Sequence, residues 1–361
     1  MLRIGIDARP LAHAHTGIGR YTSELMQRLA RRNDFSFFLY ADRPLPEFWN
    51  SFATVRTGNN TSRMRSTLFA QWQYPTWSTK DQLDIFWSPR HHLPLRLKIP
   101  TVVTIHDLVW WRVPKTMPRS GCLLEWILMT PTLKKAQHVI AVSNNTRKDI
   151  IELLPDAAHK TTVIYEAPFV RPIETVVTPE HPYILFVGTL EPRKNLPRLL
   201  QAYAAYAAQR KSPLPLILAG RQGWGPDIRK IIRERDLDPL VKQVVPDSDD
   251  HLRALYQGCL FLATPSLYEG FGLPIVEAMA HGKPVLAGNT GSMPELAENC
   301  GILADPESVE EIKSAISSLC DDASLRDKLA ACARERAREF SWTETADRTA
   351  AVIIKAANNA C

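Results

Sequence analysis

The sequence has no long apolar run and few cysteines, and each absence narrows the class of protein. None of its hydrophobic stretches approaches the ~20 residues that a membrane-spanning helix needs. The N-terminus, residues 1–7, has the pattern of a strand that ends in an acid, not that of a secretory signal peptide. The six cysteines include no C-x-x-C pair, so we expect them to be reduced, in a cytoplasmic protein.

Negative charge is scarce in the first half of the chain. Residues 1–170 carry 22 Lys and Arg against 13 Asp and Glu, whereas the remaining residues carry 22 against 25. This excess predicts an anionic partner for the first half. There is no stripe of basic and aromatic residues and no zinc pattern, so nucleic acid is not expected. An anionic membrane surface or a phosphorylated acceptor fits better, and solvated helix faces are the alternative.

Short apolar runs alternate with helical periodicity along the whole chain, which predicts parallel sheets with helices on both faces. The alternation stops once, at a proline-rich stretch that favours a stiff linker. We therefore predict an α/β fold with two doubly wound domains that face each other across a cleft. The expected parts are residues 1–168, a linker over 169–182, a second domain over 183–341 and a last helix over 342–361. The strands expected in the first domain are residues 2–6, 36–40, 84–87, 101–105, 139–142 and 162–165, and its expected helices include 19–31 and 123–136.

One strand-loop-helix unit, residues 260–287, carries the strongest functional pattern. After an apolar strand, Gly270 and Gly272 permit a turn and a close approach of backbone to a ligand. Pro274 suits the first turn of a helix and Gly282 suits the position just past its end. A helix that begins in this way attracts an anion, because its unpaired amides and its dipole point towards the same place.

Two carboxylates flank this helix start. Glu269 lies in the loop and Glu277 lies about one turn inside the helix, so the two are expected to contact different parts of one ligand. We interpret the unit as a site for a phosphorylated sugar, with its phosphate at the helix start and its hydroxyls on the carboxylates. A loop acid beside an ordinary surface glutamate is the structural alternative.

Two cations follow the first strand of the second domain. After Gly188, Arg193 and Lys194 lie where a diphosphate could bind, because Arg contacts two oxygens at once and Lys supplies a compact charge. They could offset the charge on a departing nucleoside diphosphate, a role that a metal often has in other enzymes. The acidic run from Asp247 to Asp250 is interpreted as a helix cap and not as a D-x-D metal site, so we expect no metal cofactor.

Two weaker patterns lie in the first domain. Gly17 and Gly19 follow the first strand and open a helix, where their amides could approach a phosphate or simply form a tight turn. His106 ends another strand, at the edge where ligands of doubly wound sheets bind, although a lone histidine is often structural. The aromatic and basic stretch 109–112 after it could contact an amphiphilic acceptor or a membrane surface.

Together these motifs resemble family 4 of the retaining glycosyltransferases, which have the GT-B fold of two Rossmann-like domains. The resemblance covers the whole chain, and its specific part is the pair of glutamates with the Arg-Lys loop. It implies that the last helix crosses back onto the first domain. It also implies a nucleoside-diphosphate sugar donor, retention by front-face attack and no metal requirement. The site residues implied for donor binding are Gly17, Gly188, Arg193, Lys194, Phe271, Gly272, Leu273 and Glu277, with His106 and Glu269 as the catalytic pair.

The opening residues 3–11 and the 16–21 segment look most similar to bacterial mannosyl- and rhamnosyltransferases of O-antigen and exopolysaccharide assembly. The resemblance therefore implies GDP-mannose as donor and a lipid-linked saccharide acceptor, with the protein peripheral on the inner face of the inner membrane. Three alternatives stay open: a different donor such as GDP-rhamnose or a UDP-sugar, a nucleotide-sugar 2-epimerase, and a non-catalytic scaffold that binds the nucleotide sugar.

Overall fold

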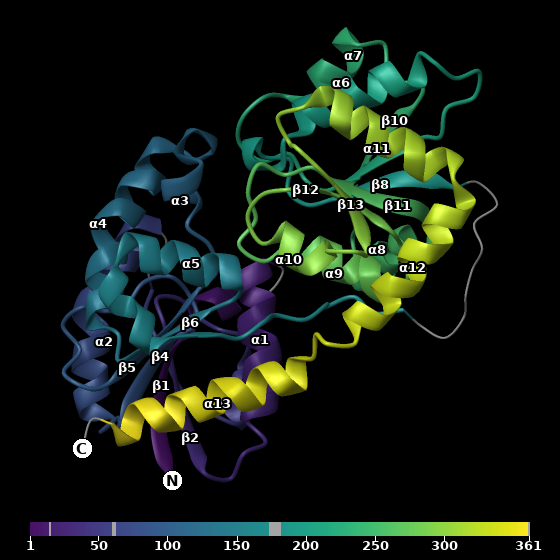
Figure 1. The fold of residues 1–361 in the computed structure, drawn as a ribbon. Coiled ribbons are helices and arrows are strands. Elements are labelled where there is room, and N and C mark those ends of the chain that lie inside the picture. Colours follow the sequence, from purple (N-terminus) through teal and green to yellow (C-terminus); the bar gives the residue numbers. More distant parts are fainter. Residues whose placement is uncertain (14–15, 60–62, 173–181, 360–361) are drawn as a thin grey trace. The chain divides into compact units, whose positions relative to one another are not determined.

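The computed structural model describes residues 1–13, 16–59, 63–172 and 182–359. The chain divides into two compact units, each built on one sheet (Figure 1). The first unit comprises residues 1–108, 123–166 and 341–361, and the second comprises residues 109–122 and 167–340. The segment 109–122, expected in the first domain, thus packs with the second unit, where the Trp224 indole donates a hydrogen bond of 2.8 Å to the Thr116 carbonyl.

The first unit contains a seven-stranded sheet in the order β3-β2-β1-β4-β5-β6-β7, with all neighbours parallel. Its inner strands are almost wholly buried, as strands covered on both faces must be. The strands are β1 (Leu2–Asp7), β2 (Phe35–Ala41), β3 (Thr54–Thr57), β4 (Ile85–Ser88), β5 (Thr101–Ile105), β6 (His138–Ala141) and β7 (Thr161–Val163).

Helices of the first unit present apolar faces to this sheet. In α1, Tyr21, Leu25 and Leu29 recur every four residues and are all buried, while the Thr16 hydroxyl caps the helix by accepting from the Gly19 amide at 3.1 Å. The α-helices before the predicted linker, of which α3 lies in the segment that packs with the second unit, are α1 (Gly17–Leu29), α2 (Arg63–Lys80), α3 (Val109–Arg112), α4 (Arg119–Lys135) and α5 (Asn144–Leu153). The 3-10 helices of the same part of the chain are η1 (Arg9–His13), η2 (Glu47–Ser51), η3 (Pro114–Thr116) and η4 (Pro155–Lys160).

The last helix, α13 (Trp342–Asn358), packs against the first unit, next to α1 (Figure 1). The Thr345 hydroxyl donates to the Tyr165 carbonyl at 2.8 Å, and Arg348 donates to the Val163 carbonyl at 2.7 Å. The chain therefore ends on the unit in which it began.

The second unit contains a six-stranded parallel sheet in the order β10-β9-β8-β11-β12-β13. Its core lies between the sheet and the helices on its faces, with α6 and α11 packed closely together. The strands are β8 (Tyr183–Val187), β9 (Leu216–Ala219), β10 (Val241–Val244), β11 (Cys259–Thr264), β12 (Val285–Gly288) and β13 (Gly301–Ala304), and the helices are η5 (Pro192–Lys194), α6 (Leu196–Ala207), α7 (Ile228–Glu234), α8 (Asp249–Gly258), α9 (Leu273–Ala280), α10 (Met293–Ala297), α11 (Val309–Asp321) and α12 (Ala323–Ala337).

The predicted α/β fold with two doubly wound parallel sheets is confirmed. Most of the predicted linker lies outside the described residues, but its first residues pack on the second unit. There Arg171 donates to the Phe340 carbonyl at 3.3 Å, and the Arg253 Nε donates to the Arg171 carbonyl at 2.9 Å.

The expectation that every cysteine is reduced is wrong for one pair. Cys300, just before β13, and Cys332, on α12, form a disulfide with their Cα atoms 5.1 Å apart. The two residues are 32 positions apart in the sequence, so no spacing motif reveals that the fold brings them together. Cys122, Cys259 and Cys320 are unpaired.

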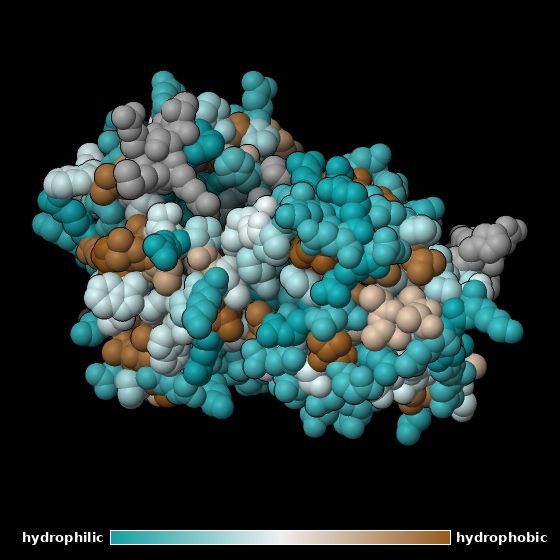
Figure 2. All heavy atoms as spheres, turned by 90° about the horizontal axis from the view of Figure 1, so that it is seen from above, coloured by the Kyte–Doolittle hydropathy of each residue, from teal (hydrophilic) through white to brown (hydrophobic). Residues whose placement is uncertain are grey.

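The surface seen in Figure 2 is mainly hydrophilic, with hydrophobic residues in small groups. None of the helices in the described part of the chain is both long enough and apolar enough to span a bilayer.

Two glycines within helices of this fold provide a matched stability test. A Cβ at Gly19 would lie 2.2 Å from the His13 carbonyl oxygen, whereas a Cβ at Gly121 of α4 meets nothing closer than the Met117 Cε at 3.7 Å. We predict that Gly19→Ala lowers stability by about 1–3 kcal/mol, because backbone must move, and that Gly121→Ala raises it by about 0.5–1 kcal/mol. Melting temperatures measured by circular dichroism test this. Equal melting temperatures for the two variants would contradict the close packing at Gly19.

Candidate functional site

The candidate donor site lies at the carboxyl ends of β8 and β11, which are neighbours in the second sheet. The loop after β8, residues 188–195, and the loop after β11, residues 265–272, are tied together. Leu267 N donates to the Arg193 carbonyl at 2.9 Å, and the Asn195 side-chain amide donates to the Pro265 carbonyl at 2.9 Å. Sequence positions about 75 residues apart thus form one site at the edge where doubly wound sheets bind ligands.

Glu269 is the centre of this site. Its side chain is 8% exposed, and it forms ion pairs with both predicted diphosphate ligands: Lys194 Nζ lies 2.6 Å from Oε1, and Arg193 Nη1 contacts Oε2. Burial alone would raise the pKa of the Glu269 carboxyl, but the charges of Arg193 and Lys194 outweigh it and lower the pKa to about 2. Glu269 is therefore a fixed carboxylate at neutral pH.

Arg193 and Lys194 differ in how many of their N–H donors form hydrogen bonds within the protein. Arg193 donates through Nε and Nη2 to Glu191, at 3.1 and 2.8 Å, and through Nη1 to the Tyr268 carbonyl at 3.0 Å in addition to Glu269. The Lys194 ammonium group has one hydrogen-bond partner among the described residues, Glu269. Arg193 therefore holds the loops together, and Lys194 keeps N–H donors for a further acceptor.

Glu277, on α9, is buried beside this cluster. The Tyr256 hydroxyl donates to its Oε2 at 2.8 Å, and the Val170 amide approaches its Oε1 at 3.4 Å. Both contacts orient the carboxylate within the second unit. A carboxylate fixed in this way can accept hydrogen bonds from a pair of neighbouring hydroxyls.

The helix start predicted from Gly272 and Pro274 is present. Gly272 caps α9 with φ 111°, which is a conformation that glycine adopts without strain, and Leu273 is the first helical residue. Phe271 is buried, and the Ser292 hydroxyl donates to its carbonyl and, at 3.1 Å, to the Glu269 carbonyl. The end of the helix is also as predicted, because Gly282 follows it with φ 66°.

Gly188 is a second position that requires glycine. Its φ is 143°, and a Cβ there would lie 3.4 Å from Lys194 Cε and 3.6 Å from Nζ. A side chain at this position would therefore strain the backbone, and its Cβ would lie in van der Waals contact with Lys194, the cation that keeps donors available.

In the first unit, His106 follows β5. Its Nε2 donates to the Pro89 carbonyl at 2.9 Å, because a carbonyl oxygen can only accept, and its Nδ1 lies 2.8 Å from the Glu166 carboxylate. The Tyr21 ring meets the imidazole edge-on, with centroids 4.8 Å apart. Both ring nitrogens are engaged within the first unit, so the ring is held in one orientation.

Gly17 is the first residue of α1. Glycine is required at position 19 because a Cβ there would clash with the His13 carbonyl. A role for the Gly17 amides or for His106 beside the donor stays a prediction, and so does the cleft between the two domains.

The acidic run after β10 is a helix cap, as predicted. The Ser248 hydroxyl accepts from the His251 amide at 3.1 Å at the start of α8, and Asp247 contacts His251. Among the described residues, no group of three or more His, Cys, Asp or Glu side chains is placed to hold a metal ion.

Sequence reasoning missed four residues that position this chemistry. Glu166 lies near the end of the predicted first domain, and no sequence pattern singles out Glu166, Glu191, Tyr256 or Ser292 as a site residue. Their roles depend on contacts between segments far apart in the chain, such as the 60 residues between Glu166 and His106. Only the ion pair of Arg193 with Glu191 could have been inferred from the sequence, because the two residues are two positions apart.

Comparisons with known proteins agree with this geometry. The family model "Glycosyltransferase Family 4" matches residues 15–167, and "Glycosyl transferases group 1" matches residues 173–336. The chain is 30% identical to "O-antigen chain mannosyltransferase B" from Escherichia coli, over 96% of this chain and 98% of that protein. It is 29% identical to a "MMP alpha-(1->4)-mannosyltransferase" from Mycolicibacterium hassiacum, over 72% of this chain and 66% of that protein.

Solved structures support the fold. A sucrose-phosphate synthase from Thermosynechococcus elongatus matches 98% of this chain and 99% of its own with a TM-score of 0.79 at 19% identity. The Anabaena protein HepE, in complex with UDP and glucose, matches 97% of this chain and 98% of its own with a TM-score of 0.74 at 21% identity.

Two Rossmann-like parallel-sheet units with a polar site at the strand ends define a GT-B glycosyltransferase. The chain belongs to glycosyltransferase family 4, within the glycosyl transferases group 1, and is a hexosyltransferase. Its relatives include mannosyltransferases of O-antigen synthesis.

The buried cluster predicts how stability depends on pH. Because the folded pKa of Glu269 lies below its ordinary value of 4.5, its ion pairs stabilise the fold above pH 4.5, and this contribution disappears as the pH falls towards 2. We predict that Glu269→Gln costs about 3 kcal/mol at pH 7, because two buried cations lose their partner. The difference in melting temperature from wild type should then shrink between pH 4.5 and pH 2.

The control for this measurement is Glu335→Gln, because the Glu335 side chain is 75% exposed in its ion pair with Arg338. A difference between Glu269→Gln and wild type that stays constant from pH 7 to pH 2 would show that the carboxylate charge does not stabilise the second unit.

Proposed function

We propose that the protein is a retaining, metal-independent mannosyltransferase that moves mannose from GDP-mannose to a lipid-linked oligosaccharide. The step belongs to bacterial O-antigen or exopolysaccharide assembly at the inner face of the inner membrane. The observation that carries this proposal is the 30% identity with O-antigen chain mannosyltransferase B over nearly the full length of both chains. The buried acid-base cluster of the second unit supports a donor site.

From the contacts in the second unit we infer separate roles for its charged side chains. Lys194, which keeps N–H donors, contacts the donor diphosphate, and Arg193 holds Glu269 in place. Glu269 accepts hydrogen bonds from sugar hydroxyls, since its low pKa keeps it an acceptor. Glu277 accepts from the two ribose hydroxyls. Backbone amides near Gly272 and Leu273 face the developing negative charge.

In the reaction, the bond between the anomeric carbon and the phosphate oxygen breaks, and the acceptor hydroxyl oxygen bonds to the same face of that carbon. The acceptor proton moves to the leaving phosphate oxygen of GDP. We assign the proton there because His106 has partners on both ring nitrogens. His106 lies beside the anomeric carbon in this proposal, where the Glu166 carboxylate paired with it opposes the positive charge that develops on the sugar. The two cations of the second unit supply the charge neutralisation that a metal would otherwise supply.

The donor experiment compares GDP-mannose with UDP-glucose, using a lipid-linked saccharide as acceptor and proton NMR to assign the anomer. We predict transfer from GDP-mannose with retained α configuration, unaffected by a chelator. Lys194→Gln should raise the KM for donor about 10- to 100-fold, because a hydrogen bond to a charged group is lost. The matched control is Lys328→Gln, an exposed lysine on α12.

Three results would overturn the proposal. Transfer from UDP-glucose alone would refute the donor. Activity lost with a chelator and restored by Mg²⁺ or Mn²⁺ would refute metal independence. A change in the sugar without any acceptor would indicate an epimerase.

A membrane partner is supported by exposed hydrophobic side chains on two helices of the first unit. On α4, Leu123, Trp126 and Ile127 are more than half exposed and recur at the spacing of one helix face. On α2, Leu68 and Trp72 are similarly exposed and four residues apart. Aromatic and aliphatic side chains of this kind suit the boundary between lipid headgroups and acyl chains.

Basic side chains accompany these hydrophobic residues. The Arg96 guanidinium lies 4.1 Å from the centre of the Trp72 ring, and Arg119 and Lys134 are exposed near the two ends of α4. Hydrophobic side chains flanked by cations favour a surface of anionic lipid.

We predict that the double variant Trp126→Ser, Ile127→Ser weakens binding to phosphatidylglycerol vesicles about tenfold or more, because two side chains no longer enter the interface. Co-sedimentation measures this. Val245→Ser, which removes an exposed hydrophobic side chain from the second unit, is the control and should bind like wild type. Equal binding by the double variant and wild type would exclude α4 as the docking helix.

A further inference from the structure

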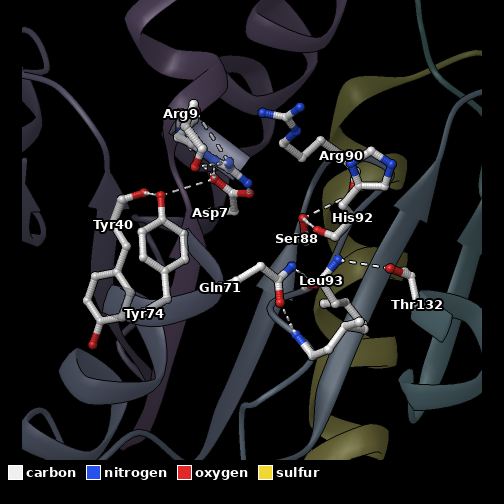
Figure 3. A network of polar contacts seen from close by, with 12 residues as sticks. Asp7, Arg9, Tyr40, Gln71, Tyr74, Ser88, Arg90, His92, Leu93 and Thr132 are labelled. Atoms are coloured by element: carbon white, nitrogen blue, oxygen red, sulfur yellow. Dashed lines mark hydrogen bonds and ion pairs between the residues drawn. The ribbon is translucent and has the colours of Figure 1, made fainter. Parts of the chain in front are cut away.

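Three neighbouring strands of the first sheet bring a second group of cations to one edge. β1, β4 and β5 lie side by side and run parallel, so the residues that follow them meet at the same edge. Asp7 ends β1 and Arg9 comes soon after it, Arg90 follows β4, and His106 follows β5. Figure 3 shows the β1 and β4 residues from close by.

Arg9 is neutralised within this group. It is buried and ion-paired with Asp7, with 2.8 Å from its Nε to Oδ1 and 2.5 Å from its Nη2 to Oδ2, while its Nη1 donates to the Ser66 carbonyl at 2.9 Å. Burial raises the pKa of Asp7, but the charge and hydrogen bonds of Arg9 outweigh it and lower the pKa. Asp7 is therefore already matched by Arg9, and the buried Asp42, which also acts on Arg9, pairs with Arg43.

Arg90 has no such partner. In Figure 3 its guanidinium extends towards the Arg9 side of the network and no contact joins it to the other residues drawn. The Arg90 carbonyl accepts from the Ser88 hydroxyl at 2.9 Å, but no hydrogen bond or ion pair to the Arg90 guanidinium is present among the described residues. Glu125, the other nearby acid, is engaged by His92 Nε2 at 2.9 Å and His91 Nδ1 at 3.7 Å.

The surroundings of Arg90 disfavour its own charge. Burial and then the positive charge of Arg9 lower the pKa of Arg90, and Asp7 and Glu125 offset them only in part. The Arg90 side chain is half-buried beside a second guanidinium and none of its donors is taken up by another described residue, so an anion would find both charge and hydrogen-bond donors there.

We propose that Arg90, backed by Arg9, is a binding site for a phosphate or diphosphate group of a substrate. A guanidinium matches two phosphate oxygens at once, which a lysine cannot do. The site adjoins the predicted catalytic histidine: Pro89, whose carbonyl accepts from His106 Nε2, is the residue before Arg90, and the His91 and His106 rings are 5.8 Å apart.

The identity of the anion rests on the proposed function. A lipid-linked acceptor carries a diphosphate between lipid and sugar, and the donor carries a diphosphate of its own. The donor diphosphate already has Lys194 in the second unit, so the acceptor diphosphate is the expected ligand of Arg90.

The test is calorimetric titration of the full chain with inorganic pyrophosphate in the presence of saturating GDP, which occupies the nucleotide site. We expect wild type to bind pyrophosphate, Arg90→Gln to bind it about 10- to 100-fold more weakly, and Arg90→Lys to be intermediate. The affinity for GDP should be unchanged. Arg31→Gln, which removes an exposed arginine of the same unit, is the control.

Weaker binding of GDP itself by Arg90→Gln would support the anion site and assign it to the donor diphosphate. Pyrophosphate binding by Arg90→Gln equal to that of wild type would overturn the proposal. The melting temperature of Arg90→Gln distinguishes a binding role from a structural one. Loss of a cation without a partner should leave the melting temperature unchanged or raise it. A lower melting temperature with unchanged pyrophosphate binding would make Arg90 a structural residue. Pyrophosphate binding requires no sugar transfer, so this result stands apart from the outcome with GDP-mannose.

Discussion

The pairing of one buried carboxylate, Glu269, with Arg193 and Lys194 is the interaction on which the second unit's site depends. It joins the loops after two neighbouring strands, so the same contacts that stabilise the fold also shape the donor site. Burying these charges separately would cost several kcal/mol each, and together they are stable because the cations lower the pKa of the acid. These contacts hold both loops in place before any ligand arrives, and the proposed stabilisation of a departing phosphate requires such a preorganised surface.

The two strand-end clusters differ in their balance of charge. In the second unit, Glu191 and Glu269 match Arg193 and Lys194, and Lys194 keeps donors that we propose contact the ligand. In the first unit, Asp7 matches Arg9, and the Arg90 guanidinium has no partner among the described residues. Part of the excess of basic residues in the first half of the sequence is thus half-buried at Arg90, and part is exposed near α2 and α4.

The alternating pattern of apolar runs predicted both sheets because parallel strands buried on two faces are almost continuously hydrophobic. It missed β3, an edge strand with exposed ends, and α2, whose helical period is obscured by Pro75 and by aromatic residues around the helix. Glycine and proline predicted the start and end of α9 because they act through local backbone conformation. The partners of Glu269 and Glu277, and the Cys300–Cys332 disulfide, depend on contacts across the fold that no local pattern contains.

Hydrogen-deuterium exchange with and without GDP tests the central claim most directly, because it locates the nucleotide without requiring an acceptor. The account predicts that GDP slows exchange in residues 188–195 and 266–277, the two loops and the helix start that Glu269 joins. Protection confined to other segments, with these two unchanged, would contradict it.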